Sequence, residues 1–261
     1  MNSKITLTLH NFGKVPSLLF LPFAFPRKFF RLAWTGLTNP RLMGELVEHF
    51  PHRKWIQSKK FATFIDVGSF IGSSSFAIRV MRPDIDIFAF EPVQSNYEFL
   101  ITNMKSDMHF KAYQVALGSA NGSGEIHQNA FPASSSILEL DEQHKRQYPY
   151  AASTSREKVQ IARLDDYLAE MKISPPVFLK IDVQGFELEV LKGAENCLDQ
   201  VECVFLEVSF LPLYKGQCGF DGIHEFLSTR GFVFMGSYDH QYTKSGDLIQ
   251  ADLLYCRNPG S

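Results

Sequence analysis

Four acidic residues each follow a short apolar run, and this pattern predicts a shared site. They are Asp66, Glu91, Asp182 and Glu207. The apolar runs have the length and composition of buried strands, and ligands of parallel α/β sheets bind where the carboxyl ends of the strands meet. Carboxylates gathered there could accept hydroxyl groups, face a cation or take up a proton. Each carboxylate alone is weak evidence, because polar residues commonly end strands.

A glycine-rich turn after Asp66 narrows the choice of ligand. The segment DVGSFIG at 66–72 places Gly68 and Gly72 between a predicted strand and a predicted helix. It lacks the lysine of a phosphate-binding loop. Phe70 stands where the dinucleotide fingerprint requires a second glycine. The turn is therefore tight without being built for phosphates, although the glycines alone would also fit an ordinary strand-to-helix turn.

Glu91 points to the ligand class. It lies 19 residues after Gly72, at the end of the second predicted strand. A carboxylate in this position accepts ribose hydroxyls in NAD sites. Asp66, just before the turn, suits a cation better than a phosphate. A nucleoside with a positive centre and no phosphate matches both features, and S-adenosylmethionine is such a molecule.

The elements that must position these residues alternate between strands and helices. Strands are predicted at 61–66, 85–90 and 110–117, and helices at 73–81 and 93–104. This β-α-β-α-β order is typical of a parallel sheet covered by helices. The polar stretch 119–158 is predicted to form a hairpin plus a long loop.

The alternation resumes in the second half of the chain. Strands are predicted at 159–164, 177–181 and 201–206, helices at 186–194 and 220–227, and a final antiparallel pair at 232–235 and 251–255. Asp165 is expected to cap the helix that follows it, and Gly231 to close the helix before it. Residues 1–59 are predicted to be a helical and loop extension, and 60–261 the α/β domain.

Composition excludes several classes of protein. The 261 residues carry a formal net charge of −2, which gives no sign of a nucleic-acid partner. With 45% hydrophobic and 21% charged residues, the chain is globular rather than disordered. The four cysteines, Cys197, Cys203, Cys218 and Cys256, form no CxxC pair. Neither a zinc site nor a disulfide framework is therefore expected, and a reducing, cytoplasmic location fits best.

The N-terminal segment leaves three alternatives open. The apolar run at 17–25 is about half as long as a bilayer span requires, and Pro22 interrupts it. We expect the segment to pack on the domain. The second alternative is a weak contact with a membrane surface through residues 17–31, with Arg27, Lys28 and Arg31 supplying positive charge. The third is an anchor.

Longer motifs resemble the FkbM family of methyltransferases. They are DVGSFIG at 66–72, FEP at 90–92, ALG at 116–118, LDDYL at 164–168, LKIDVQGFELEVLKGAE at 179–195 and FLEVSFLPLY at 205–214. The resemblance covers residues 60–257, and the block at 179–195 is its most specific part. The sequence departs from the family pattern at Ser69 and Phe70, where Ala-Asn is usual, and at Gln184, where Glu is frequent.

The resemblance implies a class I methyltransferase fold, which is a Rossmann-like α/β architecture. Such a fold has a mostly parallel seven-stranded sheet, helices on both faces and an antiparallel C-terminal strand. The implied reaction transfers a methyl group from S-adenosylmethionine to a hydroxyl of a sugar, glycolipid or secondary metabolite. The implied partner is therefore a small-molecule or glycan acceptor, with no nucleic acid expected.

Carried over to this sequence, the cofactor contacts fall into three groups. Asp66, Gly68, Ser69 and Gly72 would surround the methionine part, Glu91 and the neighbouring Pro92 would hold the ribose, and Val115 and Ala116 would lie beside the adenine. The departure at Ser69 and Phe70 would remove one polar contact to the methionine part.

Methyl transfer to a hydroxyl needs a group that removes the proton, because an aliphatic hydroxyl is a poor nucleophile. Asp182 is the predicted general base, with capping of the helix at 186–194 as its alternative role. Glu187 could act on the substrate or favour the helix dipole, and Glu207 could bind substrate hydroxyls. Lys180 is expected to point to the opposite sheet face or to pair with a carboxylate. A divalent ion between Asp182 and Glu207 would lack a third ligand, so no metal is predicted.

A second class of function stays open. A non-catalytic protein could keep this fold and bind a partner or a membrane through residues 1–60 and the loop at 119–158. The intact set of Asp66, Gly68, Gly72, Glu91 and Asp182 argues against that reading. No feature of the sequence identifies the acceptor itself.

Overall fold

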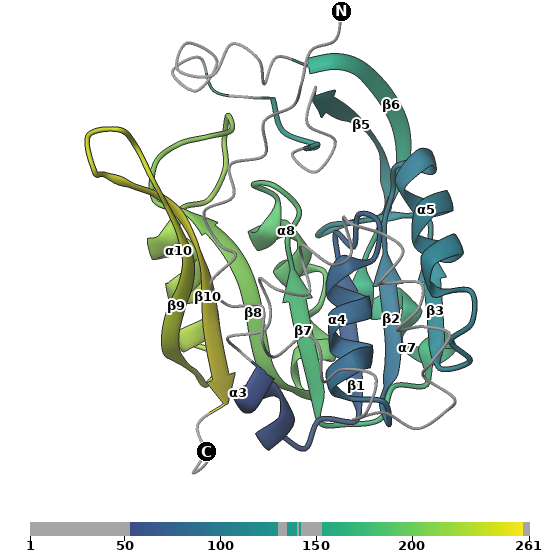
Figure 1. Ribbon diagram of the computed structural model, residues 1–261. Helices are drawn as coiled ribbons and strands as arrows, with labels where there is room; N and C mark the ends of the chain where they lie inside the picture. The colour runs from purple at the N-terminus through teal and green to yellow at the C-terminus, as the bar shows by residue number, and fades with distance from the viewer. Residues whose placement is uncertain (1–52, 130–134, 140, 142–152, 258–261) are drawn as a thin grey trace, which may run out of the picture.

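A computed structural model describes residues 53–129, 135–139, 141 and 153–257 (Figure 1). Its main sheet has seven strands in the order β3-β2-β1-β7-β8-β10-β9. The strands are β1 Thr63–Val67, β2 Asp86–Phe90, β3 Phe110–Tyr113, β7 Val177–Ile181, β8 Val201–Ser209, β9 Phe232–Tyr242 and β10 Leu248–Arg257. The first five in this order are parallel, and β10 is antiparallel to β8 and β9. The predicted fold class is confirmed.

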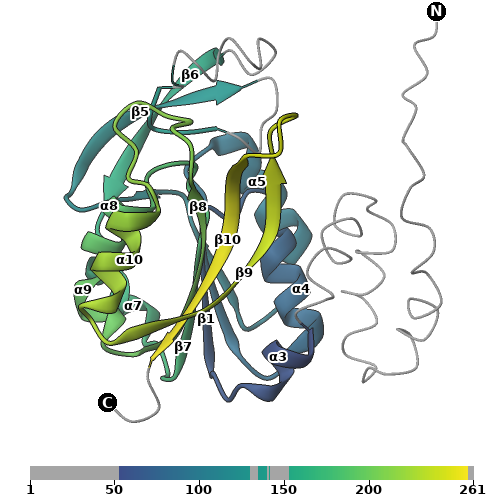
Figure 2. The ribbon, with the colours of Figure 1, turned by 90° about the vertical axis from the view of Figure 1, so that its left-hand side faces the viewer.

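Helices cover both faces of the main sheet (Figure 2). One face carries α3 Arg53–Ser58, α4 Ser73–Met81 and α5 Gln94–Met104; the other carries η6 Leu164–Tyr167, α7 Leu168–Met171, α8 Glu187–Lys192, α9 Glu195–Leu198 and α10 Phe220–Ser228. Successive strand side chains enter opposite cores. Phe64 packs on the α4 side with Phe178, whereas Ile65 and Leu179 pack on the α8 side. A strand that is buried on both faces has a mainly apolar sequence, and for this reason these strands could be predicted from the sequence.

The predicted strand at 110–117 divides between two sheets. Its first half is β3, and its second half is β4 Ala116–Leu117 in a three-stranded sheet with β6 Ser153–Ala162 and β5 Gly122–Asn129. β2 ends at Phe90, opposite Tyr113, so the chain loses its partner there and pairs with β6 instead. β5 and β6 form the hairpin predicted within 119–158. Most of the predicted loop between them lies outside the described residues.

Three strands run further than predicted. β8 continues to Ser209 because β10 pairs with it as far as Gln250. Glu207 therefore lies inside the strand, opposite Asp252, rather than just after its end. β9 and β10 likewise extend the predicted pair at 232–235 and 251–255 into a long hairpin.

The prediction that Asp165 caps the helix after it is wrong. Neither η6 nor α7 has a side-chain cap. The Asp165 carboxylate instead accepts backbone N–H groups of Asn196 (3.2 Å) and Cys197 (2.9 Å), in the first turn of α9. A side chain that satisfies helix N–H groups from a distant segment joins two parts of the chain, and local sequence spacing does not reveal it.

The cysteine expectation also needs correction. Cys203 of β8 and Cys256 of β10 form a disulfide. The antiparallel register places these two residues directly opposite each other. They are 53 residues apart in sequence, so no spacing motif announces the pair. Cys197 and Cys218 are free.

The predicted N-terminal extension is described only from Arg53 onward, where α3 begins. Residues 17–31, considered for a membrane contact, lie outside the described residues. Among the residues that are described, no helix is both long enough and apolar enough to cross a bilayer.

Candidate functional site

A cavity of about 570 Å³ opens at the carboxyl ends of the parallel strands. It collects residues that are far apart in sequence and that follow different strands. The predicted site residues that line it are Gly68, Glu91, Pro92, Val115, Ala116 and Asp182. Ile126 of β5 also lines it, so the β5–β6 hairpin stands over this end of the main sheet (Figure 1). Asp66, Ser69, Gly72, Glu187 and Glu207 are not among the lining residues.

The glycine turn brings the backbone at Gly68 close to the backbone at Asp182. Gly68 has a φ of 77°, and a Cβ there would overlap the backbone carbonyl of Asp182. The backbone N–H groups of Gly68 and Ser69 both donate to the Phe90 carbonyl at 3.0 Å. The turn is thus fixed between the ends of β2 and β7, and only glycine fits its first position. Gly72, with a φ of 88°, lies against the Leu100 side chain of α5.

Glu91 is held at the cavity wall by three donors. One carboxylate oxygen accepts the N–H of Phe70 at 2.9 Å, and the other accepts the N–H of Val93 at 3.0 Å and Nδ2 of Asn96 at 3.2 Å. The side chain is only 5% exposed. Burial raises the pKa of Glu91 to about 7, although the three hydrogen bonds oppose that shift.

Asp66 and Ser69 lie beneath the turn instead of facing the cavity. Asp66 is fully buried, and one of its carboxylate oxygens accepts the Ser75 hydroxyl of α4 at 2.6 Å. Its other oxygen has no hydrogen bond and lies 3.8 Å from Nζ of Lys180. Burial raises the pKa of Asp66. The Ser69 hydroxyl donates to the Asp66 carbonyl at 2.7 Å. Both residues therefore support the turn from below.

Asp182 faces the cavity between two fixed neighbours. Nζ of Lys180 lies 3.3 Å from one carboxylate oxygen, and Nε2 of Gln184 donates to the other at 2.9 Å. The Asp182 side chain is 35% exposed. α8 has no side-chain cap, so the alternative capping role of Asp182 is wrong. Lys180 pairs with the carboxylates of Asp66 and Asp182, which is one of the two alternatives expected for it from the sequence.

Gln184 joins Asp182 to Glu207. Its Nε2 donates to both carboxylates, at 2.9 and 2.8 Å, and its Oε1 accepts the Tyr214 hydroxyl at 2.9 Å. The second oxygen of Glu207 accepts Nε2 of Gln250. Burial, followed by the charges of Asp182 and Asp252, raises the pKa of Glu207 well above its ordinary value. Both oxygens of Glu207 are thus engaged by amide N–H donors, and burial shifts this carboxyl towards its protonated form relative to an exposed glutamate.

Sequence reasoning did not select Gln184, Tyr214 or Gln250 for this network. The available signals were the position of Gln184, two residues after Asp182 and where the family frequently has Glu, and the place of Tyr214 at the end of the motif 205–214. Among the residues that the structure describes, no group of three His, Cys, Asp or Glu side chains could hold a metal ion. An amide N–H stands between Asp182 and Glu207, the two carboxylates considered for such an ion.

Glu187 braces the loop that carries Asp182. It is buried, and one carboxylate oxygen accepts the N–H groups of Val183 (3.2 Å) and Gly185 (3.0 Å). Burial raises the pKa of Glu187 to about 7. The side chain therefore acts on the backbone of the loop rather than on the cavity.

We expect Glu187→Gln to remove part of the pH dependence of stability. The folded protein binds a proton at Glu187 more tightly than the unfolded chain, so this group stabilises the fold below pH 4.5 and that stability is lost as pH rises to about 7. A glutamine keeps the oxygen that accepts both N–H groups but does not ionise. Between pH 5 and pH 8, the variant should gain roughly 1–3 kcal/mol of unfolding free energy relative to the wild type.

Urea unfolding at pH 5, 6, 7 and 8 measures this difference. Glu189→Gln is the matched control, because Glu189 lies two residues further along α8 and its pKa is lowered by Lys192 and Ser119. A constant difference between Glu187→Gln and wild type across the range would contradict the prediction.

Comparison with known proteins identifies the family to which this chain is related. Residues 66–234 match the model of the methyltransferase FkbM domain. A 2-O-methyltransferase, NoeI of Sinorhizobium fredii, is 24% identical over 67% of this chain and 76% of its own length. The hexuronic acid methyltransferase AglP of Haloferax volcanii is 27% identical over 55% of this chain and 54% of its own. The solved O-methyltransferase TomG of Streptomyces achromogenes covers 92% of this chain and 95% of its own, at 13% identity and a TM-score of 0.44.

Proposed function

The chain belongs to the FkbM family of methyltransferases, which makes it an S-adenosylmethionine-dependent enzyme, and we propose that it methylates a hydroxyl group of a sugar. The observation that carries this proposal is that Asp182 lines the same cavity as Gly68 and Glu91. A proton acceptor thus stands beside residues suited to a nucleoside. The printed names of two relatives, a 2-O-methyltransferase and a hexuronic acid methyltransferase, support the acceptor class.

The residues that line the cavity fit the cofactor. The Glu91 carboxylate retains lone pairs that can accept ribose hydroxyls, beyond the three donors that already hold it. Val93, Val115 and Ala116 offer an apolar wall for the adenine. The backbone at Gly68 has no side chain to keep the methionine part away. Bound there, S-adenosylmethionine supplies an electrophilic methyl group on a positively charged sulfur.

The chain's own residues would then prepare the nucleophile. Asp182 would take the proton of the acceptor hydroxyl as that oxygen displaces S-adenosylhomocysteine from the methyl group that the cofactor would supply. Lys180 and Gln184 hold the carboxylate from two sides, so it does not have to reorient during the reaction. Glu207 is less suited to this step than Asp182, because both of its oxygens already accept amide N–H groups and it does not line the cavity.

Two measurements test the proposal. Calorimetric titration with S-adenosylmethionine and S-adenosylhomocysteine should give saturable binding to the folded protein. Incubation with S-adenosylmethionine and a panel of methyl hexosides, methyl hexuronides and oligosaccharides should add one methyl mass to at least one sugar. A short RNA and an unfolded protein serve as non-sugar acceptors.

The alternative function predicts the opposite results for cofactor binding and methylation. A non-catalytic binding module that keeps the fold would bind neither cofactor form, or would bind them without methylating any acceptor. Methylation of the RNA or the protein but of no sugar would reject the acceptor class while keeping the enzyme class.

A further inference from the structure

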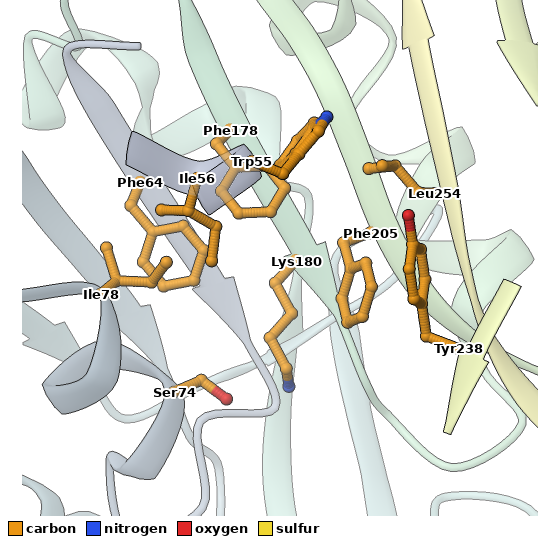
Figure 3. A pocket seen from close by; sticks show the side chains of 10 residues that line it. All are labelled: Trp55, Ile56, Phe64, Ser74, Ile78, Phe178, Lys180, Phe205, Tyr238 and Leu254. Carbon is orange, nitrogen blue, oxygen red and sulfur yellow. The ribbon is translucent and has the colours of Figure 1, made fainter. Parts of the chain in front are cut away.

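A second cavity, of about 470 Å³, lies on the α3 and α4 face of the main sheet (Figure 3). Its walls are mainly aromatic, with rings contributed by α3, β1, β7, β8 and β9. These rings are Trp55, Phe64, Phe178, Phe205 and Tyr238. Lys180 is the one charged side chain among the described residues that line it. Neither the cofactor nor the proton acceptor discussed above accounts for this cavity.

The rings form two contacting groups. Trp55 and Phe64 lie 5.6 and 5.4 Å from Phe178, measured between ring centroids. Phe205 and Tyr238 lie 6.1 Å apart on the other side of Lys180. Figure 3 shows that the Lys180 side chain runs past these rings and ends near Ser74. One end of an aromatic chamber is therefore polar.

Lys180 connects this chamber to the first cavity. Its Nζ lies 3.3 Å from the Asp182 carboxylate, and Asp182 lines the cavity suited to the cofactor. The ion pair thus stands between the two spaces. In-line displacement requires the acceptor oxygen to approach the methyl carbon from the side opposite the sulfur. Asp182 would have to reach that oxygen to take its proton, and the aromatic chamber begins on the Lys180 side of Asp182.

We propose that this chamber is the acceptor subsite and binds an uncharged sugar ring by its apolar face, an inference that rests on the proposed function. The C–H groups on one face of a sugar ring carry slight positive charge, and aromatic faces are negative, so the two attract. The ring's hydroxyl edge would then point to the polar end, at Lys180 and Asp182.

The charges at that end favour a neutral ring over an anionic one. The Lys180 ammonium is faced by the carboxylates of Asp182, at 3.3 Å, and Asp66, at 3.8 Å. Little positive charge is left to attract a second carboxylate from a hexuronate. The chain's own residues 1–52 are a competing occupant, because they precede α3 in the sequence and Trp55 of α3 lines the chamber.

Trp55 makes the chamber directly observable. The chain has two tryptophans, so Trp34→Phe leaves Trp55 as the only indole reporter. In that background, methyl glucoside should change the Trp55 emission saturably, without any cofactor present. Methyl glucuronide should bind at least 10-fold more weakly, because its charge meets an already neutralised lysine.

Three further variants in the Trp34→Phe background test whether the change in Trp55 emission comes from a sugar bound in the chamber. Ser74→Phe places a ring near Lys180 and should abolish the response. Tyr238→Ala removes one wall and should weaken glucoside binding about 10-fold, and in the methylation assay it should raise KM for the sugar more than it lowers kcat. Phe99→Ala is the control, because Phe99 is 59% exposed on α5 and lines neither cavity.

The outcomes separate this inference from the proposed function. If Trp55 does not respond while the protein binds S-adenosylmethionine and methylates a sugar, the enzyme stands and the subsite is overturned. If acrylamide does not quench Trp55 in the full chain and no sugar changes its emission, the chamber is filled by the chain's own residues. That result also overturns the proposed subsite. A saturable response that Ser74→Phe removes supports the subsite even if no cofactor binds, in which case the proposed function alone fails.

Discussion

Asp182→Asn is expected to slow methyl transfer by about 100- to 10,000-fold, the usual contribution of general acid–base catalysis. Asparagine has nearly the same shape and keeps an oxygen and an amide at the cavity wall, but it does not take up a proton. Cofactor affinity should change by less than about threefold, because Glu91 and the glycine turn, not Asp182, are the groups suited to the cofactor. The measurements are single-turnover methylation of the best sugar and calorimetric titration with S-adenosylmethionine.

Two variants make this result specific. Glu207→Gln keeps an oxygen that can accept hydrogen bonds and alters a side chain that does not line the cofactor cavity, so it should lower the rate much less than Asp182→Asn. Asp199→Asn alters a carboxylate with 86% exposure and should change nothing. Near-normal turnover in Asp182→Asn, or a larger loss in Glu207→Gln, would transfer the role of base away from Asp182.

The sequence predicted the parallel part of the fold because burial on both faces leaves a direct signature. β1, β2 and β7 read as short, mainly apolar runs, and each ends next to a glycine turn or an acidic residue. It did not predict where the run at 110–117 breaks. The alternating apolar residues Tyr113, Val115 and Leu117 satisfy one straight strand equally well. Only the end of the partner strand at Phe90 forces the chain into a second sheet.

The site was predictable to the level of which segments meet, but not to the level of which side chains face inward. Asp66 and Glu91 both follow apolar runs, yet one carboxylate turns under the loop to Ser75 and the other turns to the cavity. Gln184 has a φ of 56°, a conformation that sequence does not announce for a glutamine, and this turn lets its amide reach both Asp182 and Glu207. Such orientations depend on tertiary packing. The Cys203–Cys256 pair depends on register in the same way.

Glu91 should control cofactor affinity in a pH-dependent manner. Its pKa is raised to about 7 by burial, so a large fraction of the carboxyl is protonated at pH 6 and most is ionised at pH 8. The ionised form accepts ribose hydroxyls more strongly, since hydrogen bonds to a charged group contribute about 1.5–3 kcal/mol. Wild-type affinity for S-adenosylmethionine should therefore rise from pH 6 to pH 8.

Two substitutions separate charge from hydrogen bonding at this position. Glu91→Ala should weaken cofactor binding by about 10- to 100-fold at pH 8, which corresponds to the loss of one charge-assisted contact. Glu91→Gln retains an acceptor oxygen without a titrating group, so its affinity relative to wild type should fall steadily from pH 6 to pH 8. Taking the ratio to wild type cancels ionisation of the cofactor itself.

Calorimetric titration at pH 6, 7 and 8 provides the comparison, with Glu98→Gln as the control because Glu98 is exposed on α5 and lines neither cavity. A ratio of Glu91→Gln to wild type that stays constant with pH would mean that Glu91 does not change its charge between pH 6 and pH 8, which would contradict a pKa of about 7. Unchanged affinity in Glu91→Ala would remove the residue from the cofactor site. The cavity between Gly68 and Val115 would then have to hold the nucleoside through its backbone and its apolar walls alone.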